Sequence, residues 1–244
     1  MIALPGSTVE IVTVATDHVA PEVIAALVLR LTADERVRMD RLVRAIDRHT
    51  FAVARALVRQ TLSAHGPTAA GDWRFEINRY GCPFIVAAQA GTPRLHFNLS
   101  HTAGLVAVAV TRGHDVGVDV ERADRVVREP IAERHFAAEE VRDLLALPEA
   151  AQPRAFFEYW TLKEAYIKAR GMGLAIPLGD FAFRLRPPAP PAIAFADGFA
   201  DTPARWQFWQ AWPTPDHRLS LAVVREGADL DVRLTALPPE ALVG

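Results

Sequence analysis

The sequence predicts an α+β protein built from two similar halves. Segments of strand length alternate with helix signals along the 244 residues, a pattern typical of this class. A helix-opening motif at 31–35 and a helical stretch at 51–62 both return at an offset of 105. We therefore expect a pseudo-twofold duplication with halves at 1–112 and 113–244, and a ligand site at the seam between them.

The first half contains signals for two helices and several strands. An apolar run at 9–14 predicts the first strand. Thr32 and Glu35 form a capping box that opens a helix, and the His-Gly-Pro sequence at 65–67 ends the next helix. The other expected elements are a short connection at 21–31, a helix at about 48–64, strands at 73–77, 95–99 and 105–110, and a loop at 100–104.

The second half repeats this order. Residues 115–121 predict a strand, and residues 136–140 match the earlier helix-opening motif. Phe156 and Leu162 occupy the places that Phe51 and Leu57 hold in the first half. Further strands are expected at 181–185, 205–212 and 219–224, with the proline-rich segment 187–191 as a loop.

Bulk properties exclude several classes of protein. Apolar residues make up 50% of the chain, enough for a sizeable core, and a net charge of −2 gives no electrostatic case for nucleic acid. A single cysteine, Cys82, forms no intramolecular disulfide and suits a reducing compartment. No apolar run is long enough to span a membrane, and the N-terminus lacks a basic signal-peptide region. We expect a soluble, cytoplasmic monomer.

Two lysines mark the first candidate site. Lys163 and Lys168 are the only lysines among the 27 Lys plus Arg residues. Lysine is a compact point charge, suited to a phosphate oxygen or to proton transfer. Glu164 lies four residues before Lys168 in a predicted helix, so these two side chains share a face. The alternative is that two ordinary surface lysines persist by chance.

A pair of carboxylates marks the second candidate site. Asp119 and Glu121 alternate with valines on a predicted strand, so both point to one face, roughly 7 Å apart along the strand. Gly117 shares this face and leaves room for a ligand. The alternative is the solvated face of an amphipathic strand.

A third stretch, at 97–102, contains Ser100 next to His101 at a strand end. Taken alone, such a pair is an ordinary loop feature. Taken with the other stretches, the carboxylates form an oxygen-only donor set that favours Mg²⁺ or Mn²⁺, and the lysines and His101 are suitable phosphate partners. The residues therefore indicate metal-assisted transfer from a diphosphate.

These stretches resemble the 4′-phosphopantetheinyl transferases of the surfactin-synthetase type. The family has a G-[IV]-D-[IV]-E strand motif, a W-x-x-K-E-[AS]-x-x-K helix motif and an upstream F-N-[LI]-S-H motif. In this chain they are residues 117–121, 160–168 and 97–101, and the resemblance covers roughly residues 30–225. It implies transfer of the phosphopantetheine arm of coenzyme A to a serine of an apo acyl or peptidyl carrier protein, with release of 3′,5′-ADP.

The resemblance also implies roles for single residues. Asp119, Glu121 and Glu164 would hold Mg²⁺, and Glu164 or a metal-bound water would accept the serine proton. Lys168 would contact the transferred phosphate or protonate the leaving side. Coenzyme A would be contacted by Ser100, His101, Lys163 and Lys168. The first half would bind the nucleotide, and the second half would carry the metal and the catalytic residues.

Two positions depart from the family pattern. Cys82 stands where the family has Lys or Arg in Tyr-Gly-x-Pro, and Thr50 stands where an Arg is usual. Both missing cations normally face the nucleotide. A hydrogen bond to a charged group contributes about 1.5–3 kcal/mol, so their loss predicts coenzyme A binding weakened by roughly 10²–10⁴-fold. Arg48, or Arg38 and Arg41 on the preceding helix, could substitute for these cations.

Two other functions fit the same residues. A non-catalytic module would bind coenzyme A or a carrier domain without transfer, and the departures at Cys82 and Thr50 favour it. A different Mg²⁺-dependent phosphotransferase could use the same scaffold. Retention of all three carboxylates favours the active transferase. The sequence does not indicate which carrier protein it serves.

Overall fold

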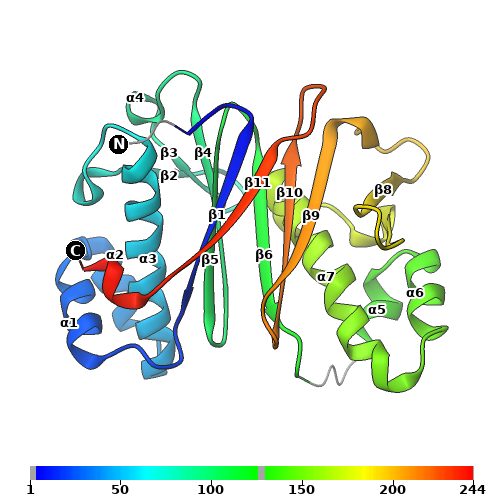
Figure 1. Cartoon of the computed structure of the whole chain (residues 1–244), viewed down its shortest axis with the longest axis horizontal. Helices are drawn as coiled ribbons and strands as arrows, with labels where there is room; N and C mark the ends of the chain where they lie inside the picture. Colours follow the sequence, from blue (N-terminus) through cyan, green and yellow to red (C-terminus); the bar gives the residue numbers. More distant parts are fainter. Residues whose placement is uncertain (1–3, 126–129, 244) are drawn as a thin grey trace. The chain divides into compact units, whose positions relative to one another are not determined.

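The chain forms two compact units (Figure 1). The structure is a computed structural model, and it describes residues 4–125 and 130–243. Within these residues, unit 1 comprises 4–76, 83–113 and 231–243, and unit 2 comprises 77–82, 114–125 and 130–230. The division expected from the sequence, 1–112 and 113–244, therefore misplaces two segments. The turn at 77–82 belongs to unit 2, and the C-terminal segment belongs to unit 1.

Unit 1 is a four-stranded sheet with helices packed against it. The strand order is β11-β1-β5-β4, in which β11 runs parallel to β1 and the other pairs are antiparallel. The parallel pairing of β11 with β1 explains why the end of the chain returns to this unit. The strands are β1 Thr8–Ala15, β4 Leu95–Thr102, β5 Leu105–Arg112 and β11 Asp231–Leu237, and a small pair is formed by β2 Phe75–Ile77 and β3 Pro83–Ile85.

Helix α3, Ala45–His65, packs on the sheet of unit 1 with its apolar face. Leu57 and Leu62 on this face are fully buried. Helix α2, Ala33–Asp40, begins at the predicted capping box, because the Thr32 side chain accepts from the Glu35 amide and Glu35 accepts from the Thr32 amide. The remaining elements are α1 Pro21–Leu29, η1 Ala70–Asp72, α4 Ala87–Ala90 and η6 Pro239–Leu242.

Unit 2 is a three-stranded antiparallel sheet with one long helix across it. The strand order is β6-β10-β9, and α7, Gln152–Ala169, packs against β6 and β10 (Figure 1). The strands are β6 Val116–Arg122, β9 Trp206–Thr214 and β10 His217–Val224, with a separate hairpin of β7 Phe181–Arg184 and β8 Ala192–Phe195. The helices are α5 Ile131–His135, α6 Ala138–Leu145 and the short turns η2 Glu149–Ala151, η3 Gly173–Ala175, η4 Leu178–Asp180 and η5 Pro203–Arg205.

The two units share an order of elements that accords with the predicted duplication. Helices α2 and α6 begin and end at residues that differ by 105. In each unit, a glutamate in the first turn of this helix pairs with a cation on the long helix: Glu35 with Arg59, and Glu140 with Lys163. Each unit also has an antiparallel run of three strands, β1-β5-β4 and β6-β10-β9. The pseudo-twofold packing and the seam site stay predictions.

Several sequence predictions of local structure were wrong or incomplete. The segment 100–104 was expected to be a loop, but β4 continues to Thr102, so Ser100 and His101 belong to a strand. The strands β8 and β11 were not predicted. Strand β11 alternates charged and apolar residues and has a sheet neighbour on one side within the described residues, which leaves a weak sequence signal. None of the described helices is both long enough and apolar enough to span a membrane.

Candidate active site

Strand β6 and helix α7 touch at Gly117. A Cβ atom at this position would lie 2.1 Å from the carbonyl oxygen of Ala165 and 2.4 Å from the backbone nitrogen of Ala169. Only glycine allows the helix backbone to approach the strand this closely. The space at Gly117 was expected to receive a ligand, but it is filled by the helix. The consequence is that the next residues on the same strand face, Asp119 and Glu121, are held beside α7.

This packing brings Lys168 to Asp119. The Lys168 Nζ donates to Asp119 Oδ1 at 2.6 Å, and the Asp119 residue is 4% exposed. Glu121, two residues further along β6, forms an ion pair of 3.0 Å with Arg125. Asp119 is therefore not part of a solvated strand face, and the alternative weighed for this strand does not hold at its position.

Glu164, one of the three predicted metal-binding carboxylates, has an altered ionisation. Burial on α7 raises its pKa to about 7, and the charge of Asp119 and, to a smaller extent, that of Glu121 add to the rise, while Lys168 opposes it. The structure thus brings together four predicted site residues in unit 2: Glu164, Asp119, Glu121 and Lys168. Their separation in sequence is bridged by the contact between β6 and α7.

The donor set fits a hard divalent cation, but it is not arranged as a finished metal site. Within 4–125 and 130–243, no three His, Cys, Asp or Glu side chains are placed so that they could hold a metal ion. Asp119 and Glu121 are instead paired with Lys168 and Arg125. Burial, and after it the charge of Asp119, raises the pKa of Glu164, and a divalent cation held beside it would favour the ionised carboxylate. Oxygen-only ligands favour Mg²⁺ or Mn²⁺.

The burial of Glu164, together with its repulsion from Asp119, predicts that this residue affects the stability of the fold. Because its pKa is about 7 in the folded state and about 4.5 ordinarily, the folded state loses stability as the pH rises through this interval. Glu164→Gln removes this loss. With EDTA present, we expect the variant to be about 2 kcal/mol more stable than the wild type at pH 8, or about 5 °C in Tm, with little difference at pH 4.5. Thermal melts at both pH values check this, and an equal or lower Tm at pH 8 would contradict it.

Lys163 does not have the environment that was predicted for it. Its side chain is fully buried, and its Nζ donates to Glu140 Oε2 and to the backbone oxygens of Leu178 and Phe181, each at 2.7 Å. An ammonium has three donors, so all of them are used. The predicted contact between Lys163 and a coenzyme A phosphate is therefore wrong. Burial lowers the pKa of Lys163 and raises that of Glu140, while their attraction opposes both shifts.

Glu140 connects three parts of unit 2. Besides Lys163, it accepts hydrogen bonds from the backbone nitrogen of Phe183 on β7 at 2.8 Å and from that of Ala137 at 3.0 Å. Ala137 lacks the side-chain oxygen that Thr32 supplies in unit 1, so only half of the capping box is formed here. The pair of Glu140 and Lys163 is a structural clamp that fixes α7 against α6 and β7.

The other predicted ligand-binding residues lie in unit 1. Ser100 and His101 are on β4, where Ser100 is buried and His101 is exposed. Arg38 is exposed on α2, and Arg48 is half-buried on α3. Their contact with coenzyme A stays a prediction. Thr50 on α3 is buried, so a ligand-facing cation would not fit at this position without a change in packing.

The turn that contains Cys82 lies close to Lys168 in unit 2. Asn78 donates to the backbone oxygen of Gly171, just beyond α7, at 2.7 Å. Burial raises the pKa of the Cys82 thiol, Asp115 raises it further, and Lys168 lowers it. Position 82 is thus within electrostatic range of Lys168. A thiol with a raised pKa stands there, where the family has a cation.

Sequence reasoning missed Asp201, which organises the end of α7. Its Oδ2 accepts from the Tyr166 hydroxyl at 2.9 Å, from Arg170 at 2.6 Å and from the Trp206 indole at 3.0 Å. Asp201 lies in a loop between β8 and β9, and no spacing in the sequence connects it to α7. It holds the helix that carries Glu164 and Lys168.

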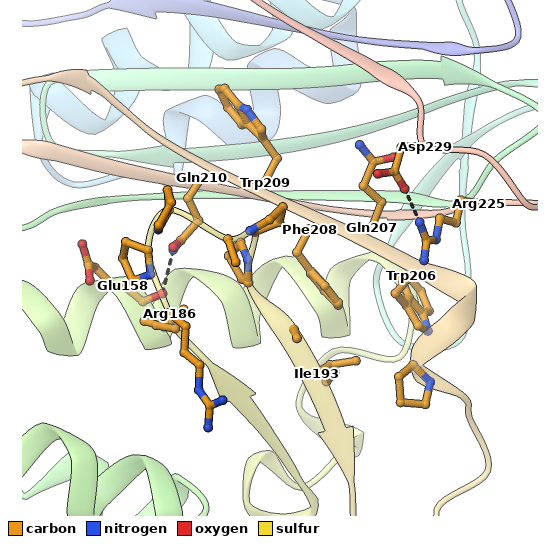
Figure 2. A pocket seen from close by; sticks show the side chains of 18 of the residues that line it. Glu158, Arg186, Ile193, Trp206, Gln207, Phe208, Trp209, Gln210, Arg225 and Asp229 are labelled. Atoms are coloured by element: carbon orange, nitrogen blue, oxygen red, sulfur yellow. Dashed lines mark hydrogen bonds and ion pairs between the residues drawn. The ribbon is translucent and has the colours of Figure 1, made fainter.

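A pocket of about 580 Å³ lies elsewhere in unit 2. Figure 2 shows its lining, in which the proline-rich connection after β7 faces residues of β9. The Gln210 side chain donates a hydrogen bond to the backbone oxygen of Glu158. Glu158 is the one residue of α7 that lines it, and none of the carboxylates of the candidate site does. Because neither Asp119 nor Lys168 lines this pocket, we assign the pocket no role in the chemistry of the cluster.

Comparison with known proteins places the chain in a family. Residues 115–223 match the 4′-phosphopantetheinyl transferase superfamily. The chain is 32% identical over 167 residues to the 4′-phosphopantetheinyl transferase Sfp of Bacillus subtilis, a match that covers 68% of this chain and 72% of Sfp. It is 31% identical over 175 residues to the transferase HetI of Nostoc, covering 71% and 73%, and 43% identical over 93 residues to psf-1 of Bacillus pumilus, covering 38% and 39%. The chain therefore belongs to the 4′-phosphopantetheinyl transferase family.

Proposed function

We propose that this protein transfers the 4′-phosphopantetheine arm of coenzyme A to a serine of an apo acyl or peptidyl carrier protein and releases 3′,5′-ADP. One observation supports this most: Glu164 lies within electrostatic range of Asp119, Glu121 and Lys168, on elements that Gly117 allows to touch. Such a cluster can hold a cation against an anionic diphosphate, and it can supply a proton acceptor.

The residues of the cluster would divide the tasks of the reaction among them. Asp119, Glu121 and Glu164 would hold Mg²⁺ or Mn²⁺, which when bound would neutralise charge on the diphosphate. Glu164 would also accept the proton of the carrier serine. Lys168, on the same helix face and paired with Asp119, would contact the transferred phosphate. Ser100, His101, Arg48 and Arg38 of unit 1 contact coenzyme A.

The test is the mass of the carrier. Apo acyl and peptidyl carrier domains are incubated with the protein, coenzyme A and Mg²⁺, and their intact mass is measured. A phosphopantetheine-sized gain that free 3′,5′-ADP suppresses would establish the transfer. If no carrier gains mass while coenzyme A binds, the protein is a non-catalytic binding module.

Position 82 gives a prediction about substrate affinity. Cys82→Arg restores the cation of the family pattern near Lys168, and Asp115 is close enough to support its charge. We expect the variant to bind coenzyme A about 10-fold more tightly or better, since a charged hydrogen bond contributes about 1.5–3 kcal/mol. Calorimetric titration checks the change, with Cys82→Ser as the neutral control. Equal affinity in both variants would show that no cation is needed there.

A further inference from the structure

Unit 1 contains a pocket of about 480 Å³ that none of the proposed transferase residues lines. It lies between the end of α1, the middle of α3, η1 and the C-terminal turn η6. Its volume is within the range of small-molecule sites. Its walls combine three arginines with buried leucines: Arg30, Arg55, Arg59, Leu27, Leu31 and Leu242.

Two of the three arginines have structural partners. Arg30 donates to the backbone oxygen of Leu242 at 3.0 Å, which holds the C-terminal turn against α1. Arg59 forms an ion pair of 2.9 Å with Glu35 and donates to the backbone oxygen of Trp73 at 3.0 Å. Within 4–125 and 130–243, this is the one ion pair that the pocket arginines make. The pocket therefore carries an excess of positive charge.

Arg55 makes no hydrogen bond and no ion pair among the described residues. No acceptor among the described residues receives a hydrogen bond from it, and its Nε is shielded from water. Its guanidinium lies over the ring of Phe51, with 4.9 Å from Cζ to the ring centre. Burial lowers its pKa, as do Arg38 and Arg59, while Glu35 opposes the shift. A cation in such a place costs stability unless something compensates it.

The ordinary explanation for such an arginine is that its stem covers apolar surface while its head stays in water. That arrangement would leave the whole guanidinium solvated. At Arg55 the Nε is instead dry and without an acceptor, in a pocket where a neighbouring arginine has already taken the nearest carboxylate. The planar guanidinium is the side chain best suited to grip an oxyanion with two parallel hydrogen bonds.

We propose that this pocket binds a small organic anion, a carboxylate or phosphate monoester joined to an apolar group, with Arg55 as its main contact. The anionic end meets Arg55, and the apolar part lies against Leu27 and Leu31. The site belongs to unit 1 alone and does not depend on the carboxylate cluster of unit 2.

The test uses phenyl phosphate, benzoate and the neutral control phenol, titrated calorimetrically in phosphate-free buffer with coenzyme A at saturation. We expect both anions, but not phenol, to bind saturably. Arg55→Gln is expected to weaken this binding about 10- to 100-fold. Arg44→Gln is the matched control, because it removes the same charge from an exposed position at the start of α3. It should leave the affinity unchanged.

Stability gives a second readout that does not depend on the probe. Arg55→Gln removes an uncompensated cation, so its Tm should equal or exceed that of the wild type, and lost binding cannot then be ascribed to unfolding. The proposal is overturned if neither anion binds saturably or if the two arginine variants bind alike. It is also overturned if the anions bind only when coenzyme A is left out, since the pocket would then be part of the substrate site.

Discussion

Replacing Glu164 by Gln is expected to lower kcat/KM for carrier modification by about 10³-fold. Glutamine keeps the size of the side chain but cannot accept a proton, and it is a poor ligand for a hard cation. Loss of a general base alone costs about 10²–10⁴-fold. Glutamine has the size of glutamate, and the change removes a half-buried carboxylate whose pKa is raised, so we expect the fold to tolerate it.

The matched control is Glu158→Gln, on the same helix. Glu158 is also half-buried and lies 3.6 Å from Arg218, outside the cluster. We expect its kcat/KM to stay within a few-fold of the wild type. Rates are measured as carrier modified per minute with carrier concentration varied. If Glu164→Gln retains full activity, or if Glu158→Gln loses as much, the assignment of the proton acceptor to Glu164 is wrong.

Breaking the clamp of Glu140 and Lys163 is expected to destabilise unit 2 strongly. Glu140→Gln leaves the ammonium of Lys163 fully buried without its carboxylate. Removing one partner of a buried ion pair costs about 3–5 kcal/mol, which lowers Tm by about 10 °C in a chain of this size. The double variant Glu140→Gln with Lys163→Met should recover much of this loss, because the unpaired charge is gone.

Lys163→Met separates the structural role from the predicted phosphate contact. If Lys163 acts only in the clamp, the variant changes Tm and leaves KM for coenzyme A unaltered at a temperature where it is folded. A raised KM with an unchanged Tm would restore the phosphate contact and refute the structural role. Thermal melts and initial rates on the same preparations supply both values.

Local patterns in the sequence predicted the members of the cluster but not how they are held. Alternation along a strand put Asp119 and Glu121 on one face, and a spacing of four put Glu164 beside Lys168. These two faces meet because Gly117 allows α7 to pack closely on β6. This contact is part of the tertiary structure and cannot be deduced from local sequence patterns. From the sequence we expected free space for a ligand at this glycine. A missing side chain leaves room, but the sequence does not show whether a ligand or another part of the chain fills it.

The role of Lys163 was beyond sequence reasoning for a similar reason. Its partners are the carboxylate of Glu140 and backbone oxygens of Leu178 and Phe181, which are 15 to 18 residues further on and carry no signal in their side chains. The return of β11 to unit 1 likewise rests on pairing with β1, more than 200 residues away in sequence. The helix-opening motifs were predictable because both of their partners lie within four residues.

The most direct test of the account is the binding of Mn²⁺ to the carboxylate cluster. Mn²⁺ is titrated into the protein with coenzyme A present, and free Mn²⁺ is followed by electron paramagnetic resonance. We expect the wild type and Glu158→Gln to bind one ion, and Asp119→Asn and Glu164→Gln to bind it at least 10-fold more weakly. Equal binding by all four proteins would contradict the assignment of Asp119 and Glu164 as ligands, and the proposed mechanism with it.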